Sequence, residues 1–262
     1  MARAASQPFS ALFWNVWVRA QCNPQKLALL RKRLEHIVHL HKPDVIGLNE
    51  IIEGTAGTPA PLLECLSQLG YHTFFAPFSP ERNKRMSGSA FASRIAPADI
   101  RFRELGPDKS AARRGQSGHT IKLIHARIPL AGQHVNVVVN HLAHLVPYNW
   151  STHIVHHKSF MRLMQAPDLQ KLTIVGGDFN QFKFMARFWK AEDLYNRATG
   201  TFLSPTWKLL GKIPIIQANY DNIFWTKCGN LELTDFAVLS RNPSDHAPLL
   251  ASFRVTPEIN RI

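Results

Sequence analysis

The sequence predicts an α/β fold in which β-sheets are covered by helices. Three observations lead to this prediction: short apolar runs rich in strand formers, amphipathic helical segments between them, and polar side chains where the apolar runs end. The 262 residues show no internal repeat and no long low-complexity linker, so we expect residues 1–262 to form one domain. A composition of 45% hydrophobic and 19% charged residues is typical of a globular protein with a sizeable core.

The chain opens with a predicted βαβ unit. Residues 10–18 form an apolar run rich in strand formers. Asn23 and Pro24 supply an N-cap and a first-turn proline, and apolar residues then recur at spacings of three and four until Pro43 ends the helix. Residues 44–48 follow as a buried strand. If the two strands lie parallel in one sheet, the helix is the crossover that joins them.

The rest of the chain continues this interspersed order of strands and helices. Residues 88–95 and 119–128 alternate like strands of a half-exposed sheet. Further strands are predicted over residues 71–75, 135–139, 172–175, 215–225, 233–240 and 248–255, and helices over residues 62–69 and 152–165.

Polar side chains recur in, at or just past the apolar runs. They are Asn15, Glu50, His141, Asp178 with Asn180, Asp221, and Asp245 with His246. Function in layered α/β folds gathers at strand ends, because rigid strands aim the side chains that follow them. In the segment TIVGGDFN, two glycines allow another backbone or a substrate to approach closely. If the chain stays extended there, Asp178 and Asn180 face one cleft.

These residue types suit a hard divalent cation. Glu50, Asp245 and the amide oxygen of Asn15 are oxygen ligands, which favour Mg²⁺, with Mn²⁺ as an alternative. No cysteine takes part, which disfavours soft-metal redox chemistry. The three cysteines are widely separated and form no CxxC pair, so neither a structural zinc site nor a disulfide framework is indicated.

The remaining polar residues suit proton transfer and phosphate binding. Asp178 could orient or deprotonate a water, while His141 and His246 could bind phosphoryl oxygens or move protons. Asp221 could orient a neighbouring imidazole and raise its pKa, if the fold brings the two together. Together with the cation, this chemistry is metal-assisted hydrolysis of a phosphate ester.

Each signal has a structural interpretation when it stands alone. An Asp-x-Asn pair after a strand is often a turn or a helix cap, and Glu50 could be a first-turn carboxylate of the next element. A group of histidines could indicate zinc, but no HExxH motif or cysteine accompanies it, so scattered surface histidines are the simpler interpretation. That group is His141, His144, His153, His156 and His157.

The order of the motifs resembles the endonuclease/exonuclease/phosphatase superfamily, which includes DNase I-like and exonuclease III-like enzymes. The matching segments are FWNVW with Asn15, VIGLNE with Glu50, NHLAH with His141, GGDFN with Asp178 and Asn180, YDNIFW with Asp221, and SDHAPL with Asp245 and His246. GDFN and SDHxP together are highly specific, and the resemblance runs from about residue 12 to residue 253. More weakly, residues 88–94 resemble the family's GNAILSR strand, and Arg162 with Gln165 resembles its RxxQ.

The resemblance implies a fold and a metal site. The implied fold is a four-layer α/β sandwich, in which two packed mixed β-sheets are flanked by helices. Glu50 is then the principal metal ligand, with Asn15 and Asp245 near the metal or the phosphate.

The resemblance also implies catalytic roles. Asp178 positions or activates the attacking water, and Asn180 hydrogen-bonds the phosphate or that water. His246 contacts the scissile phosphate and is oriented by Asp221, while His141 is a second phosphate contact or a proton donor.

The sequence departs mildly from the family pattern. Asn49 stands where the family usually has Gln before the metal-binding Glu, Ser89 stands where GNAILSR has Asn, and NHL replaces THL before His141. The exonuclease III-type tyrosine is absent at the His141 position, which argues against an abasic-site repair enzyme.

The charge balance indicates polyanionic partners. With 31 Lys and Arg against 18 Asp and Glu, the formal net charge is +13. If residues 182–190 are helical, Lys183, Arg187 and Lys190 share a face that could follow a nucleic-acid backbone, although an amphipathic helix with solvated basic groups fits equally well. We group Arg162 with these three as substrate-binding candidates.

The function favoured by the sequence is a Mg²⁺-dependent phosphodiesterase that hydrolyses nucleic acid, DNA before RNA, as a DNase I-like endonuclease. The alternatives are a phosphoinositide phosphatase or sphingomyelinase-like phosphodiesterase that acts on anionic lipid headgroups at a membrane surface, and a non-catalytic nucleic-acid-binding relative. We expect a monomer. Three widely separated cysteines and the lack of an N-terminal apolar run of signal-peptide length favour a cytoplasmic location, with delivery as an effector without a cleavable signal as the alternative.

Overall fold

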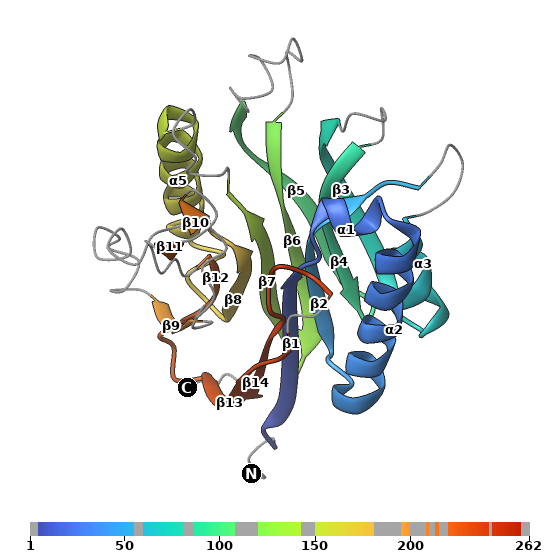
Figure 1. Cartoon of the computed structure of the whole chain (residues 1–262). Helices are drawn as coiled ribbons and strands as arrows, with labels where there is room; N and C mark the ends of the chain where they lie inside the picture. Colours follow the sequence, from blue (N-terminus) through green and yellow to red (C-terminus); the bar gives the residue numbers. More distant parts are fainter. Residues whose placement is uncertain are drawn as a thin grey trace, which may run out of the picture.

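Two six-stranded β-sheets with helices outside them make up most of the described structure (Figure 1). This computed structural model describes residues 5–54, 60–80, 86–107, 120–142, 150–180, 195–199, 208–209, 213–214, 220–240 and 243–257. The strand orders are β13-β14-β1-β2-β4-β3 and β5-β6-β7-β8-β12-β9, and β10 and β11 form a separate pair.

The strands of the first sheet are β1 (Gln7–Asn15), β2 (Val45–Ile52), β3 (His72–Pro80), β4 (Met86–Ser93), β13 (Leu231–Val238) and β14 (Leu249–Val255). Those of the second sheet are β5 (Asp99–Pro107), β6 (Thr120–Leu130), β7 (Gln133–His141), β8 (Thr173–Asp178), β9 (Tyr195–Thr199) and β12 (Asp221–Thr226). The small pair is β10 (Lys208–Leu209) and β11 (Ile213–Pro214), and the helices are α1 (Val18–Gln21), α2 (Pro24–His41), α3 (Pro61–Gln68) and α5 (Trp150–Met164).

Both sheets are mixed, and each contains one parallel pair joined through a long helix. β1 and β2 are parallel and are connected through α2, while β7 and β8 are parallel and are connected through α5. The predicted βαβ unit is therefore confirmed. Its helix begins as expected, since the Asn23 side chain accepts a hydrogen bond from the backbone N of Lys26 at 3.0 Å and Pro24 is the first helical residue.

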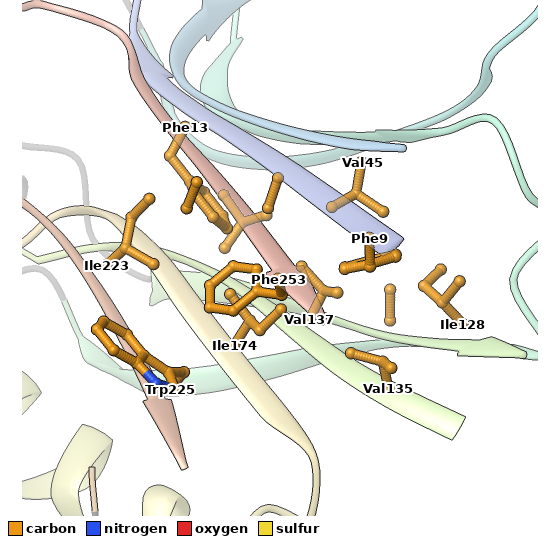
Figure 2. Packing of buried hydrophobic residues seen from close by; sticks show 14 of the residues in the cluster. Phe9, Phe13, Val45, Ile128, Val135, Val137, Ile174, Ile223, Trp225 and Phe253 are labelled. Carbon is orange, nitrogen blue, oxygen red and sulfur yellow. The ribbon is translucent and has the colours of Figure 1, made fainter. Parts of the chain in front are cut away.

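Three hydrophobic clusters define four layers. The first lies between the two sheets and includes Phe13, Val137 and Phe253 (Figure 2). The second joins the outer face of the first sheet to α2 and α3, and the third joins the outer face of the second sheet to α5 through residues such as Phe160. The order is therefore helices, sheet, sheet, helix, as the four-layer α/β sandwich requires.

The alternation of side chains along β1 explains why its sequence is apolar throughout. Phe9 and Phe13 face the second sheet, whereas Leu12 and Trp14 face the helical layer. A strand that is covered on both faces cannot alternate with polar residues, so it reads as a continuous apolar run.

Several elements differ from the expectation. β5 was not predicted, because it is an edge strand in which Arg101 and Arg103 interrupt the apolar pattern. β9 and the short β10–β11 pair were also missed. Of the strand predicted over residues 215–225, the structure describes β12 from Asp221 onward, and residues 215–219 lie outside the described part of the chain. None of the helices that the structure describes is long and apolar enough to cross a membrane.

Candidate active site

The carboxyl ends of the two parallel pairs meet at one edge of the sandwich. β1 ends at Asn15, β2 carries Glu50, β7 ends at His141 and β8 ends at Asp178. Asn15 is paired with Asn49 in the first sheet, and His141 with Asp178 in the second. Side chains that are distant in the sequence therefore converge where the two sheets face each other.

Asn15 joins two carboxylates that come from different sheets. Its Nδ2 donates hydrogen bonds to Glu50 Oε1 at 3.0 Å and to Asp178 Oδ2 at 2.9 Å. The second oxygen of Glu50, Oε2, accepts from the backbone N of Val18 at 2.9 Å. The amide oxygen of Asn15, which the sequence offered as a metal ligand, accepts from the backbone N of Trp17 at 3.0 Å.

Glu50 owes its orientation to an irregularity in β2. Strict alternation would place it on the face of Leu48, toward the helical layer. The pairing of β2 with β4 shifts register between Leu48 and Ile51, and Glu50 has a positive φ of 59°. This bulge accompanies the turn of the carboxylate toward Asn15, as bulges beside functional sites often do.

The two glycines before Asp178 allow the sheets to approach closely. A Cβ on Gly176 would lie 2.3 Å from the Phe13 ring of the opposite sheet. A Cβ on Gly177, whose φ is +132°, would lie 2.0 Å from the backbone O of Asn140 in the neighbouring strand. The predicted close approach at these glycines is therefore to the protein's own side chain and backbone.

The chain turns after Asp178, contrary to the extended geometry considered from the sequence. Asn180 has a φ of 49°, and its backbone N donates to Asp178 Oδ1 at 2.8 Å. Its Nδ2 donates to the backbone O of Leu142 at 2.8 Å. Asn180 therefore ties the chain after His141 to the end of β8, in a local side-chain turn typical of Asp and Asn.

Asn49 supports Asp178 from the opposite sheet. This fully buried side chain accepts from the backbone N of Asp178 at 3.0 Å and donates to Ser89 Oγ at 2.9 Å. Asn49 and Ser89 are two of the positions where the sequence departs from the resembled family, and they contact each other. Sequence reasoning recorded both residues but did not assign either of them a role in the site.

Asp221 and His246 form a buried ion pair. Asp221 Oδ2 lies 2.7 Å from His246 Nδ1, and the ring Nε2 lies 3.9 Å from both Asp178 Oδ2 and Asp245 Oδ1. Burial alone would lower the pKa of His246, but the surrounding carboxylates, Asp221 first, outweigh burial and raise that pKa. Burial raises the pKa of Asp221, and His246 offsets part of this increase. We therefore assign a charged imidazolium at neutral pH.

Several neighbouring residues that the sequence did not single out hold this pair in place. Trp14 Nε1 donates to the backbone O of His246 at 3.0 Å. Ser244 Oγ donates to the backbone O of Asn15 at 2.7 Å and accepts from the backbone N of His246 at 3.1 Å. The Tyr220 ring lies 6.2 Å from the His246 ring, and burial followed by the charge of Asp178 raises the pKa of Tyr220 to about 12.

The site contains two groups of potential ligand atoms, but a protonated His246 has no free nitrogen lone pair, so the group without His246 is the one that fits a divalent cation. Glu50, His141 and Asp178 form one group, and Asp178, Asp221 and His246 form the other; within each group the ligand atoms lie within 4.8 Å of one another. His141 Nε2 is 4.0 Å from Glu50 Oε1 and 3.9 Å from Asp178 Oδ2. Carboxylate oxygens with an imidazole are a donor set for hard or borderline divalent ions, so the residues fit the metal that the sequence led us to expect.

Asp245 lies at the margin of the same cluster. Asp245 is partly exposed. Burial raises the pKa of its carboxyl group, the charge of His246 offsets part of this increase, and the charge of Glu50 adds to it. The structure thus gathers all eight predicted catalytic and metal-binding residues at one edge. Five of them carry carboxyl or imidazole groups that belong to the two ligand groups.

Of the four predicted substrate-binding residues, the structure describes Arg162 alone, and Arg162 does not join this cluster. Arg162 is exposed near the end of α5, and no hydrogen bond or ion pair joins it to the site. Lys183, Arg187 and Lys190 lie outside the described residues. Within the described part of the chain, the α5 histidines do not join either metal-ligand group.

The comparisons with known proteins agree with this geometry. The model of the Endonuclease/Exonuclease/phosphatase family matches residues 12–246, and no curated protein matches the chain. The human Nocturnin catalytic domain with a bound sulfate anion has 20% sequence identity and a TM-score of 0.66, with 95% of each chain covered. D. rerio TDP2 complexed with a single-strand DNA product has 16% identity and a TM-score of 0.65, covering 94% of this chain and 99% of that chain.

A third similar structure is an endonuclease/exonuclease/phosphatase family protein from Leptotrichia buccalis, with 16% identity and a TM-score of 0.68, covering 93% of this chain and 98% of that chain. Members of the Endonuclease/Exonuclease/phosphatase family are phosphoesterases that depend on a divalent metal, and the site described above contains a candidate metal-binding group. The chain belongs to the Endonuclease/Exonuclease/phosphatase family.

Proposed function

We propose that the protein is a Mg²⁺-dependent phosphodiesterase that hydrolyses nucleic acid, with DNA preferred and internal cleavage as its mode. The observation that carries this proposal is the convergence of Glu50, His141, Asp178 and His246 at one edge of the sandwich. Three of these four residues come from different strands and the fourth from the segment before β14, so a merely structural role would not require their meeting.

The proposed catalytic roles follow from the contacts. Asp178 orients or deprotonates the attacking water, because Asn15 and Asn49 hold its carboxylate and its backbone. His246, kept charged by Asp221, contacts the scissile phosphate as a cation. His141, which lies between the carboxylates of Glu50 and Asp178, is a second phosphate contact or a proton donor.

The metal site is proposed from the same donors. Glu50 is the principal ligand, and Asp245 lies near enough to contribute electrostatically. When bound, a divalent cation stabilises the negative charge that develops on the phosphate oxygens. Mg²⁺ is proposed over softer ions because the ligand groups are rich in carboxylate oxygens.

Charge and fold support nucleic acid as the substrate. A net charge of +13 attracts a long polyanion over the whole surface and makes its binding dependent on salt. Among proteins of similar fold, D. rerio TDP2 is known in complex with a single-strand DNA product. We extend DNA binding to this chain as part of the proposal.

The experiment compares substrates directly. Plasmid DNA, RNA and phosphoinositide vesicles are each incubated with the wild-type protein, with Mg²⁺ and with chelator. We expect plasmid cleavage that requires Mg²⁺ and that Asp178→Ala and His246→Ala nearly abolish while the circular dichroism spectrum stays unchanged. Phosphate release from the vesicles with intact plasmid would assign the lipid-directed function instead. No turnover of any of the three substrates would identify a binding protein without catalytic activity.

A further inference from the structure

A second polar pocket lies at the opposite end of the second sheet. Its cavity volume is about 810 Å³, which is within the range of small-molecule sites. It lies where the β6–β7 hairpin, the loop between α5 and β8, and the turn after β12 come together. β8 runs from Thr173 near this pocket to Asp178 in the active site, about 17 Å at the usual rise of a strand. One small ligand therefore cannot occupy both sites.

The charged residues that line the pocket are predominantly basic. It comprises Arg101, Arg127, Gly132, Gln133, His134, Asn136, Pro167, Asp168, Gln170, Lys171, Leu172, Cys228 and Asn230. Pro167 and Leu172 add apolar surface beside the charged groups. A cavity that combines cations and amides with apolar surface resembles a site for a phosphorylated organic molecule more than a site for a bare ion.

Two of the cations have no acidic partner among the described residues. The two nearby carboxylates are already engaged: Asp99 with Arg101 at 2.6 Å, and Asp168 with Arg103 at 3.7 Å. Arg127 Nη2 lies 3.2 Å from Nδ1 of His134, and no ion pair between described residues involves Arg127 or Lys171. Arg127 and Lys171 therefore leave positive charge at the pocket that an anion would neutralise.

The floor of the pocket is rigid before any ligand binds. Asn136 is 5% exposed, and its Nδ2 donates to the backbone O of Asp168 at 2.9 Å. Its Oδ1 lies 3.0 Å from the Nε2 of His125, which is buried beneath the pocket, and its backbone N donates to the backbone O of Leu172 at 2.7 Å. These bonds hold the backbone of the loop that carries Lys171 against β7, so that part of the pocket is formed before a ligand binds.

We propose that this pocket is a second anion site that binds a phosphate-bearing ligand of about nucleotide size, with the phosphate held by Arg127 and Lys171. Arg127 offers a planar group that can donate two parallel hydrogen bonds to a phosphate, and Lys171 adds a point charge. The same chemistry would serve a free nucleotide or one nucleotide of a strand. The site is separate from the proposed hydrolytic activity and does not depend on it.

The test measures binding by calorimetry in the presence of chelator, so that metal-dependent binding in the active site is absent. The probes are AMP, inorganic phosphate and a short single-stranded DNA oligonucleotide. The test variant is Arg127→Gln with Lys171→Gln. The matched control is Lys32→Gln with Lys158→Gln, which removes the same charge from two exposed lysines that do not line the pocket.

We expect AMP to bind the wild type and the control alike, and to bind the test variant at least about tenfold more weakly, the effect of losing one charged contact. The test variant should keep the wild-type melting temperature and phosphodiesterase activity. If only the oligonucleotide shows this dependence, the phosphate recognised belongs to a strand, and the anion site stands. Equal binding by the test and control variants, or no binding of any probe to the wild type, would overturn the proposal.

Discussion

Replacing Asn49 by Ala tests whether this side chain supports Asp178 in catalysis as well as stabilising the fold. The side chain is fully buried and makes two hydrogen bonds, one to the backbone N of Asp178 and one to Ser89 Oγ. The Ala variant leaves a buried backbone N–H without a partner, which costs about 1–3 kcal/mol, and loses a second buried bond of about 1 kcal/mol. We therefore expect a loss of about 2–4 kcal/mol in the free energy of unfolding.

The same substitution should lower turnover in protein that is still folded. Without Asn49, the backbone of Asp178 is anchored less firmly, and loss of such a supporting partner typically costs about 10- to 100-fold in activity. Urea denaturation gives the stability, and initial rates on a phosphodiester substrate, measured well below the denaturation midpoint, give kcat.

Ser93→Ala is the matched control. Ser93 is equally buried, lies at the other end of β4, and donates to the backbone O of Ile95 at 2.7 Å, far from the site. We expect it to reduce stability while kcat stays near that of the wild type. If Asn49→Ala lost stability to the same extent as Ser93→Ala and kept a kcat within about twofold of wild type, the proposed support of Asp178 would be refuted.

Three further predictions concern other parts of the structure. Gly177→Ala should destabilise the protein by at least about 1–3 kcal/mol in urea denaturation, because the new Cβ would meet the backbone O of Asn140 at a φ of +132°; wild-type stability would contradict this packing. Asp221→Asn should lower the pKa of His246, since Asp221 is the leading cause that raises it. If the NMR titration midpoint of His246 stayed unchanged, Asp221 would not be what keeps the imidazole charged. Burial, followed by the charge of His153, lowers the pKa of His157 from 6.5 to about 3. Between these two pH values the imidazole of His157 is protonated in the unfolded state but neutral in the folded state. The free energy of unfolding therefore falls as the pH drops from 6.5 toward 3. His157→Gln should make that fall shallower in urea titrations at successive pH values, and an equal slope would contradict the assignment.

Much of the fold could be predicted because its signals are local. The N-cap and proline at the start of α2, the alternation in β6 and the apolar run of β1 each depend on neighbours in the chain. β5 escaped prediction because an edge strand can hold arginines without burying them.

The candidate site was predictable as a list of residues but not as a set of contacts. Strand ends that carry Glu50, Asp178 and His246 are visible in the sequence, since polar side chains interrupt apolar runs there. The turn at Asn180 was not visible, because its φ and its bond to Leu142 depend on how β7 and β8 lie together.

The sequence by itself determined which residues form strands, which polar residues stand at the strand ends, and that the protein carries a strong net positive charge. The spacing of apolar residues and the number of charges can both be read directly from the order of residues in the chain. Only the tertiary structure decided that Asn49 hydrogen-bonds Asp178 in the opposite sheet, and that the Glu50 carboxylate turns toward Asn15 at a bulge in β2. It also decided that a basic pocket forms at the far end of the second sheet. These features arise from the register of the strands and from the packing of one sheet on the other, and sequence spacing fixes neither.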